Sequence, residues 1–205
     1  MKAARAFLAA AVLSAPLALA AQEPPPSWTF DATAYGYFPP EDRDYGQPTV
    51  TADRGALHLE GRYNYESFRT GSLWLGWNLG AGEKLRLDVT LMAGGVFGDL
   101  RGVAPGIELT LTYGRFALYS EGEYVFDLED SSSDFFYNWS QLSYAPTDWL
   151  QLGLVAQRTR AYKTSLDVQR GFFVGFSWKS LSLTAYVFNP GWETPTFVSS
   201  LGVKF

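Results

Sequence analysis

The chain contains no cysteine and a single histidine, and both scarcities exclude classes of protein. Without cysteine there is neither a disulfide nor a lipid-modified cysteine anchor, so an exported chain must be held together by a sheet or a large core. No zinc motif, phosphate-binding glycine loop or nucleotide fingerprint occurs. The acid-rich segments 41–44 and 127–134 lack the ligand spacing of a calcium loop, so we expect neither a metal nor a cofactor.

Long apolar runs are also missing, except at the start of the chain. Lys2 and Arg5 precede a run from Ala6 to Ala20 that is interrupted by Pro16. This run is shorter than the roughly 20 residues that a membrane-spanning helix needs. A basic start, a short apolar run and small residues at its end predict a cleaved signal peptide over residues 1–20. A proline-rich linker over 21–27 follows it.

Basic residues are fewer than acidic ones. Once Lys2 and Arg5 leave with the signal peptide, 14 of the 16 basic residues remain against 21 acidic ones, a net charge of −7. Nucleic-acid binding depends on basic side chains that neutralise phosphates. This balance therefore excludes nucleic acid as an expected partner.

Strand-like segments follow one another from residue 28 to the last residue, and no helical period interrupts them. Short turns at 53–55, 81–84, 114–115, 146–148 and 179–180 alternate with longer segments at 39–47, 66–71, 98–105, 128–134, 163–167 and 189–195. The predicted strands are 28–38, 48–53, 56–65, 72–80, 84–97, 106–113, 116–127, 135–145, 148–162, 168–178, 181–188 and 196–205. Because their number is even, both ends of the barrel sequence fall on the side of the short turns, the usual topology of a bacterial membrane barrel.

Alternation within the strands separates an apolar face from a charged one. In 84–97 every second residue from Leu85 to Leu91 is apolar, whereas Arg86 and Asp88 point the other way. Because a charge that faces lipid is costly, we expect the charged face to line the interior. The lumen-lining candidates are His58, Glu60, Arg62, Arg86, Asp88, Glu108, Glu121 and Glu123.

Aromatic residues gather at both ends of the predicted strands, as the two interfaces of a membrane favour. Beside the short turns are Tyr113, Phe116, Tyr144, Trp149, Trp178 and Phe205. At the ends next to the longer loops are Tyr37, Phe38, Tyr63, Tyr65, Phe126, Phe135, Tyr137, Phe188 and Trp192. In strand 135–145 aromatics occupy both faces, so its inward face stays open.

The last nine residues alternate apolar with small or polar residues, and Phe197, Leu201, Val203 and Phe205 share one face. This strand resembles the terminal strand of Gram-negative outer-membrane β-barrels. That resemblance implies that these four residues form the signal read by the barrel-assembly machinery. The segments LEGRYNYESFRTGSLWLGWN, LYSEGEYVFD and QRGFFVGFS are similar to an uncharacterised proteobacterial barrel family, which implies the fold but no activity.

We therefore predict an all-β protein, a single antiparallel transmembrane β-barrel of about 12 strands over residues 28–205, located in the cell outer membrane. A soluble β-sandwich or lipocalin-like barrel is the alternative fold. The expected surroundings are outer-membrane lipid and lipopolysaccharide, and the oligomeric state is left open. Arg158 and Arg160 follow leucines on the outward face, where they would reach lipid phosphates unless a bulge turns them inward.

Three functions are compatible with this barrel. The first is a small porin-like channel for small polar or cationic solutes, because the inward face is rich in acids and twelve strands leave more room than eight. Glu108 and Glu121, nearly opposite across a hairpin, then belong to an ion path, to a salt-bridge network with Arg62, Arg86 and Lys84, or to a general acid–base pair.

The second function is a closed structural or surface barrel that works through its outer loops. The third is a lipid-modifying enzyme that uses His58. Known outer-membrane lipases and deacylases carry a His-x-Ser motif, whereas here His58 is followed by Leu59 and Glu60, so no catalytic role carries over.

Overall fold

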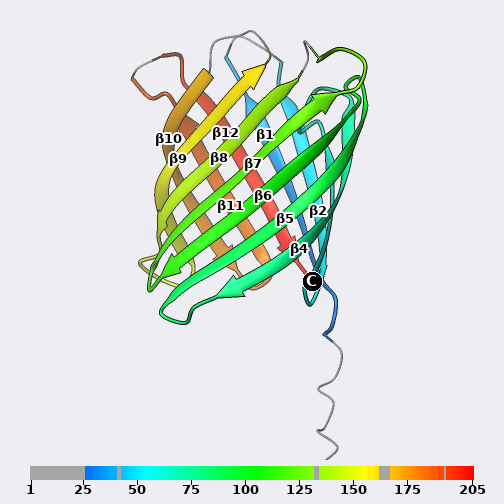
Figure 1. The fold of residues 1–205 in the computed structure, drawn as a ribbon. Coiled ribbons are helices and arrows are strands. Elements are labelled where there is room, and N and C mark those ends of the chain that lie inside the picture. Colours follow the sequence, from blue (N-terminus) through cyan, green and yellow to red (C-terminus); the bar gives the residue numbers. More distant parts are fainter. Residues whose placement is uncertain (1–25, 41–42, 132–133, 162–166, 192) are drawn as a thin grey trace, which may run out of the picture.

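A computed structural model describes residues 26–40, 43–131, 134–161, 167–191 and 193–205 of the chain. Its strands form one closed antiparallel barrel in which each strand pairs with its sequence neighbours and β1 pairs with β12 (Figure 1). The strands are β1 (Thr29–Phe38), β2 (Tyr45–Arg54), β3 (Leu57–Tyr63), β4 (Thr70–Ala81), β5 (Leu85–Gly98), β6 (Gly102–Tyr113), β7 (Phe116–Asp127), β8 (Phe135–Tyr144), β9 (Leu150–Ala161), β10 (Asp167–Trp178), β11 (Leu181–Phe188) and β12 (Thr196–Lys204). Within these ranges, no helix has the length and apolar character to cross a membrane.

The prediction of a twelve-stranded barrel is confirmed, and the largest differences lie at the starts of β2 and β6. Both strands begin earlier than predicted, at Tyr45 and Gly102, because residues typical of turns lie inside them. Pro105 has no N–H to donate to the ladder. The pairing of β6 with β7 accordingly has no partners at Ala104 and Pro105 and resumes in the same register at Gly106.

Short turns and longer loops lie at opposite ends of the barrel, and the C-terminus lies at the short-turn end (Figure 1). There the Phe205 N–H donates to the Phe30 carbonyl oxygen at 2.9 Å, and the Phe30 N–H donates back at 3.3 Å. These two bonds extend the β1–β12 closure beyond Lys204. The predicted signal peptide at 1–20 and all of the linker before Pro26 lie outside the described residues and stay predictions.

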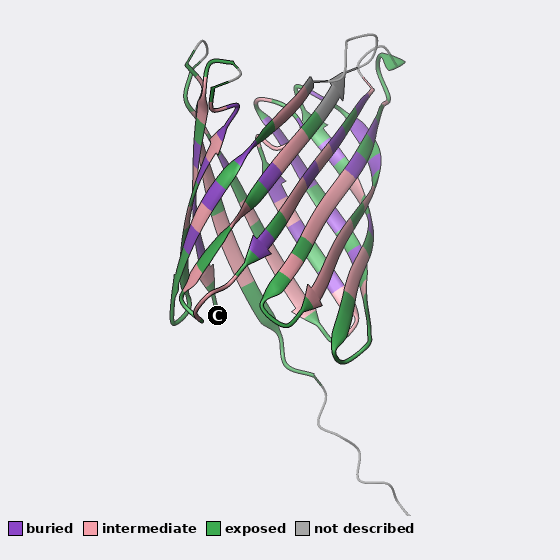
Figure 2. Cartoon of the chain, turned by 90° about the vertical axis from the view of Figure 1, so that its left-hand side faces the viewer, coloured by how far each residue is buried: buried purple, intermediate pink, exposed green. Residues whose placement is uncertain are grey.

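The outer surface of the barrel is apolar because alternate residues of each strand point outward. In β4, Leu73, Leu75 and Trp77 are 65%, 60% and 58% exposed, whereas Trp74 between them is 3% exposed. Figure 2 shows the same alternation of buried and exposed residues along neighbouring strands. A belt of exposed leucines around a closed sheet is suited to lipid rather than to water.

The aromatic residues beside the short turns lie on the outer surface, and Tyr113, Trp178 and Phe205 are more than half exposed. At the loop end the prediction of an interfacial belt is wrong for five residues, which lie inside the barrel: Tyr37, Tyr65, Phe135, Tyr137 and Phe188. Trp192 lies outside the described residues. The error arises because alternation identifies two faces but not which one is inward where both carry aromatics.

Candidate functional site

The lumen holds two cavities, one near each end of the barrel. The inner cavity, on the short-turn side, has a volume of about 850 Å³, and six of its lining side chains are carboxylates. The outer cavity, beneath the longer loops, has a volume of about 550 Å³. Tyr65 lines both cavities, so its side chain lies where they meet.

A buried ion cluster centred on Arg62 occupies the layer between the cavities. The Arg62 guanidinium donates to both oxygens of Glu60, at 2.8 and 3.1 Å, and to Glu123 Oε2 at 2.8 Å. Glu108 Oε1 lies 3.9 Å from the same guanidinium. Side-chain exposure is 2% for Arg62, 3% for Glu60 and 2% for Glu123, so water screens these charges little.

A fourth carboxylate, Glu121, faces this layer from β7. It accepts hydrogen bonds from the Tyr65 hydroxyl and, at 2.7 Å, from the Tyr119 hydroxyl. The Arg62 guanidinium lies over the rings of Tyr65 and Trp74, at 4.3 and 4.7 Å from their centroids. Arg62 thus contacts three carboxylates at this level of the lumen, and the fourth, Glu121, is held by two tyrosine hydroxyls.

Tyr65 reaches the lumen because the chain leaves β3 early. Asn64 and Arg69, at the two ends of the segment 64–69, have positive φ angles of 55° and 53°. The Asn64 side-chain oxygen accepts a hydrogen bond from the Arg69 N–H at 2.8 Å, which closes the segment into a compact loop. The ring of Tyr65 then packs edge-on against Tyr137 of β8, with centroids 5.3 Å apart.

The same loop brings Glu66 into the barrel, a residue that the sequence reasoning missed. Glu66 accepts a hydrogen bond from the Ser72 hydroxyl, which in turn accepts one from the Trp74 indole N–H at 3.0 Å. Burial raises the pKa of the Glu66 carboxyl above its usual range. No local motif signals this placement, because it follows from the inward fold of segment 64–69.

His58 lies on the inward face of β3 between two carboxylates. Its Nδ1 is 2.8 Å from Asp53 Oδ1, and its Nε2 is 3.4 Å from Glu60 Oε2. Asp53 also accepts a hydrogen bond from Asn78 at 2.6 Å. Both ring nitrogens thus face acids, and a histidine that activates a nucleophile needs one nitrogen on a hydroxyl or thiol.

Arg86 and Asp88 lie apart from this cluster, nearer the inner mouth. They pair with each other on β5 at 2.6 Å, and their side chains are 57% and 42% exposed. The expectation that Arg86 joins a network with Arg62 is therefore wrong. Both residues belong to the set of alternate residues that points inward from β5. The Arg86 guanidinium nevertheless pairs with Asp88 on the same strand, close to solvent.

The wall of the lumen opposite the charges is aromatic. Trp139, Tyr186 and Phe188 come from β8 and β11, with ring centroids of Trp139 lying 5.3 and 5.4 Å from those of the other two. Phe173 and Val155 pack beside them, all nearly buried. The charged strands β3 to β7 and the aromatic strands thus form two unlike halves of the lumen.

Arg158 is exposed on the outward face of β9, in line with Leu152 and Leu154. The pairing of β9 with both neighbours is continuous through Arg158, so no bulge turns it inward. For Arg160 only the backbone in β9 is described. On β12, Phe197 and Leu201 are 57% and 55% exposed, and Val203 is half-buried on the same face; Phe205, directly after β12, is 75% exposed.

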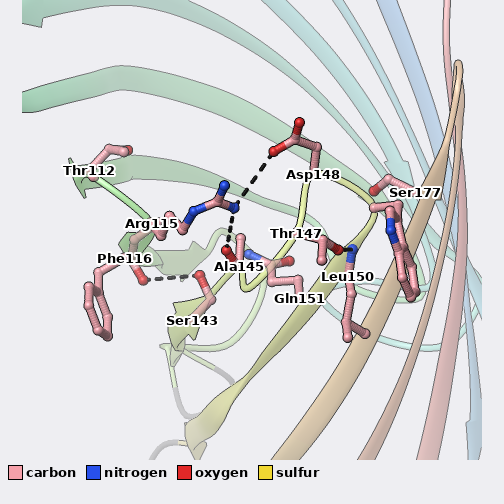
Figure 3. A pocket seen from close by; sticks show the side chains of 13 residues that line it. Thr112, Arg115, Phe116, Ser143, Ala145, Thr147, Asp148, Leu150, Gln151 and Ser177 are labelled. Atoms are coloured by element: carbon pink, nitrogen blue, oxygen red, sulfur yellow. Dashed lines mark hydrogen bonds and ion pairs between the residues drawn. The ribbon is translucent and has the colours of Figure 1, made fainter.

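A third hollow, of about 510 Å³, lies at the inner rim between the turns that follow β6 and β8 (Figure 3). There Arg115 donates to the Ala145 carbonyl oxygen at 2.9 Å and lies 3.6 Å from Asp148, whose side chain is fully exposed. Exposed ion pairs of this kind contribute little. We assign no function to this hollow.

Comparison with known proteins adds evidence on the fold. No family model matches the chain, and no curated protein matches its sequence. The KdgM porin, in its complex with disordered oligogalacturonate, superposes with a TM-score of 0.59 at 9% identity, covering 86% of this chain and 98% of the porin. The chain folds as an outer-membrane β-barrel. Omp33 of Acinetobacter baumannii also matches, with a TM-score of 0.47 at 11% identity over 88% of this chain and 98% of Omp33.

Proposed function

We propose that this barrel is a narrow outer-membrane channel that prefers small cations. The observation that carries the proposal is the layer between the two cavities, where the carboxylates of Glu60, Glu108, Glu121 and Glu123 gather around the Arg62 guanidinium and the Tyr65 hydroxyl. Rings of acidic side chains in a low-dielectric pore attract cations and repel anions. The carboxylates of the inner cavity extend the same sign of charge toward the short-turn side.

The fold shared with the KdgM porin supports a channel, but the ligand in that porin complex does not suit this lumen. Oligogalacturonate is a chain of acidic sugars. The six carboxylates that line the inner cavity disfavour such a chain, so we propose small cationic or neutral polar solutes instead. Size supports the same conclusion, because the aromatic wall and the Arg62 cluster fill part of the lumen that the described residues enclose, beside cavities of about 850 and 550 Å³.

The selectivity of this channel is tested by its reversal potential in planar bilayers under a potassium chloride gradient. The wild-type channel is expected to favour potassium, and Glu108→Gln with Glu121→Gln is expected to lower that preference severalfold without a change in fold. Glu129→Gln is the matched control, since Glu129 is an exposed loop residue paired with Arg101. A preference for chloride in the wild type, or no effect of the paired substitutions, contradicts the proposal.

A closed surface barrel is the second candidate, and one observation favours it: Tyr65 separates the cavities in this conformation. In that case refolded protein shows no conductance at all, and truncation of Tyr65 does not create any. An enzyme has less support, because His58 is engaged by Asp53 and Glu60.

The surroundings of the barrel belong to the same proposal. We infer that Arg158, exposed at the outer end of β9, meets phosphates of outer-leaflet lipid, and that the exposed face of β12 is read during assembly. Copurification of lipid A with the wild type and its loss in Arg158→Gln would support the first inference, and equal retention would contradict it.

A further inference from the structure

The outer cavity has polar groups that lack hydrogen-bond donors. Glu66, which is 9% exposed, has an Oε2 atom with no partner among the described residues, and so has the Oε1 atom of Gln157. Both side chains line the outer cavity. A buried acceptor without a donor is costly, and both atoms are covered by protein, so a donor in the cavity reaches them when the side chains turn toward it.

Two of the side-chain amides at this cavity already donate to backbone carbonyl oxygens. Gln47 donates its amide to the carbonyl oxygens of Asn64 and Tyr65, at 3.0 and 3.4 Å, and Asn64 donates to the Gly46 carbonyl oxygen at 3.1 Å. The cavity is also lined by Asp99 and Asp127, which are acceptors when ionised. A guest that fits this lining carries N–H donors and positive charge.

Aromatic rings supply the remaining wall of the cavity: Tyr45, Phe68, Phe135 and Tyr137. The chain itself places a cation on this wall, since the Arg43 guanidinium lies over the Phe68 ring at 4.0 Å from its centroid. Organic cations gain from such rings because the face of an aromatic ring is electronegative. A hydrated inorganic ion gains less from them than an ammonium or guanidinium group does.

We propose that the outer cavity is a binding site for a small organic cation bearing ammonium or guanidinium groups, with Glu66 as its counter-ion and Gln157 as a second acceptor. Burial raises the pKa of Glu66, and a bound cation would favour the ionised carboxylate. The inference rests on the proposed channel for the class of solute, a cation. Binding in the outer cavity does not require the solute to pass Tyr65.

Agmatine, which carries a guanidinium and an ammonium group, is a suitable probe, and N-butylurea is its neutral control. Isothermal titration of the refolded barrel in detergent is expected to show agmatine binding and no N-butylurea binding. Glu66→Gln, which keeps the size of the side chain, is expected to weaken agmatine binding about tenfold or more, because it removes a charged hydrogen bond. Glu129→Gln is the matched control, since Glu129 is an exposed loop residue paired with Arg101.

Folding of each variant is verified by its heat-modifiable migration on gels. If Glu66→Gln does not refold, Gln157→Leu provides the same test with a smaller expected loss. No agmatine binding by folded wild type, or equal binding by Glu66→Gln, overturns the inference. Cation-selective conductance without agmatine binding would leave the channel intact and refute only this site, whereas binding without conductance would refute the channel and leave this site intact.

Discussion

Arg62→Met is expected to lower the free energy of unfolding of the barrel by about 3–5 kcal/mol, the usual cost of removing one partner from a buried ion pair. The reason is that Glu60 and Glu123 are 3% and 2% exposed and would both lose the guanidinium that they contact. Urea unfolding in lipid vesicles measures the change.

Two further variants show whether charge is the cause. Arg86→Met removes an arginine whose pair with Asp88 is exposed, so little change is expected. Arg62→Met combined with Glu60→Gln and Glu123→Gln should recover much of the loss, since a neutral cluster leaves no unpaired charge. Equal loss in Arg62→Met and Arg86→Met would show that the cluster does not stabilise the barrel.

Tyr65→Ala is expected to raise single-channel conductance severalfold. The Tyr65 side chain lines both cavities, and its truncation would join volumes of about 850 and 550 Å³. It would also remove the hydroxyl that donates to Glu121, which frees one more carboxylate for cations in the path. Single-channel recording in planar bilayers measures the effect.

Tyr63→Ala is the control for this substitution, because Tyr63 lies two residues earlier in the chain and is 47% exposed on the outer surface. Its conductance should match the wild type. If Tyr65→Ala conducts no more than Tyr63→Ala, then the layer between the cavities is not closed by Tyr65.

Local sequence predicted the strands well because alternation is a property of each strand alone. The leucines of β4 and β5 and the charges opposite them follow from this period of two. The same argument fails for Tyr65. Alternation from Leu57 continues through Tyr65 and predicts an outward ring, but the strand ends at Tyr63, and the positive φ of Asn64 redirects the chain.

The charged residues of β3 and β7 were predictable one by one but not as a cluster. Alternation places Glu60 and Arg62 on one face of β3, and Glu121 and Glu123 on one face of β7. That Arg62 bonds Glu123 across the lumen depends on barrel size and stagger, which no local pattern contains. The proximity of Glu66 and Gln157 could not be predicted for the same reason, because it depends on the inward fold of the segment 64–69 and on closure of the sheet.

The central claim is that small cations pass Tyr65 between the two cavities. The chain has no cysteine, so one thiol introduced by Thr110→Cys in the inner cavity reports passage without background. The barrel is reconstituted in one orientation, and 2-aminoethyl or 2-sulfonatoethyl methanethiosulfonate is added only on the loop side. Faster modification by the cationic reagent than by the anionic one, and further acceleration in Tyr65→Ala, is the predicted result. No modification in either background, or equal rates for the two reagents, would contradict the account.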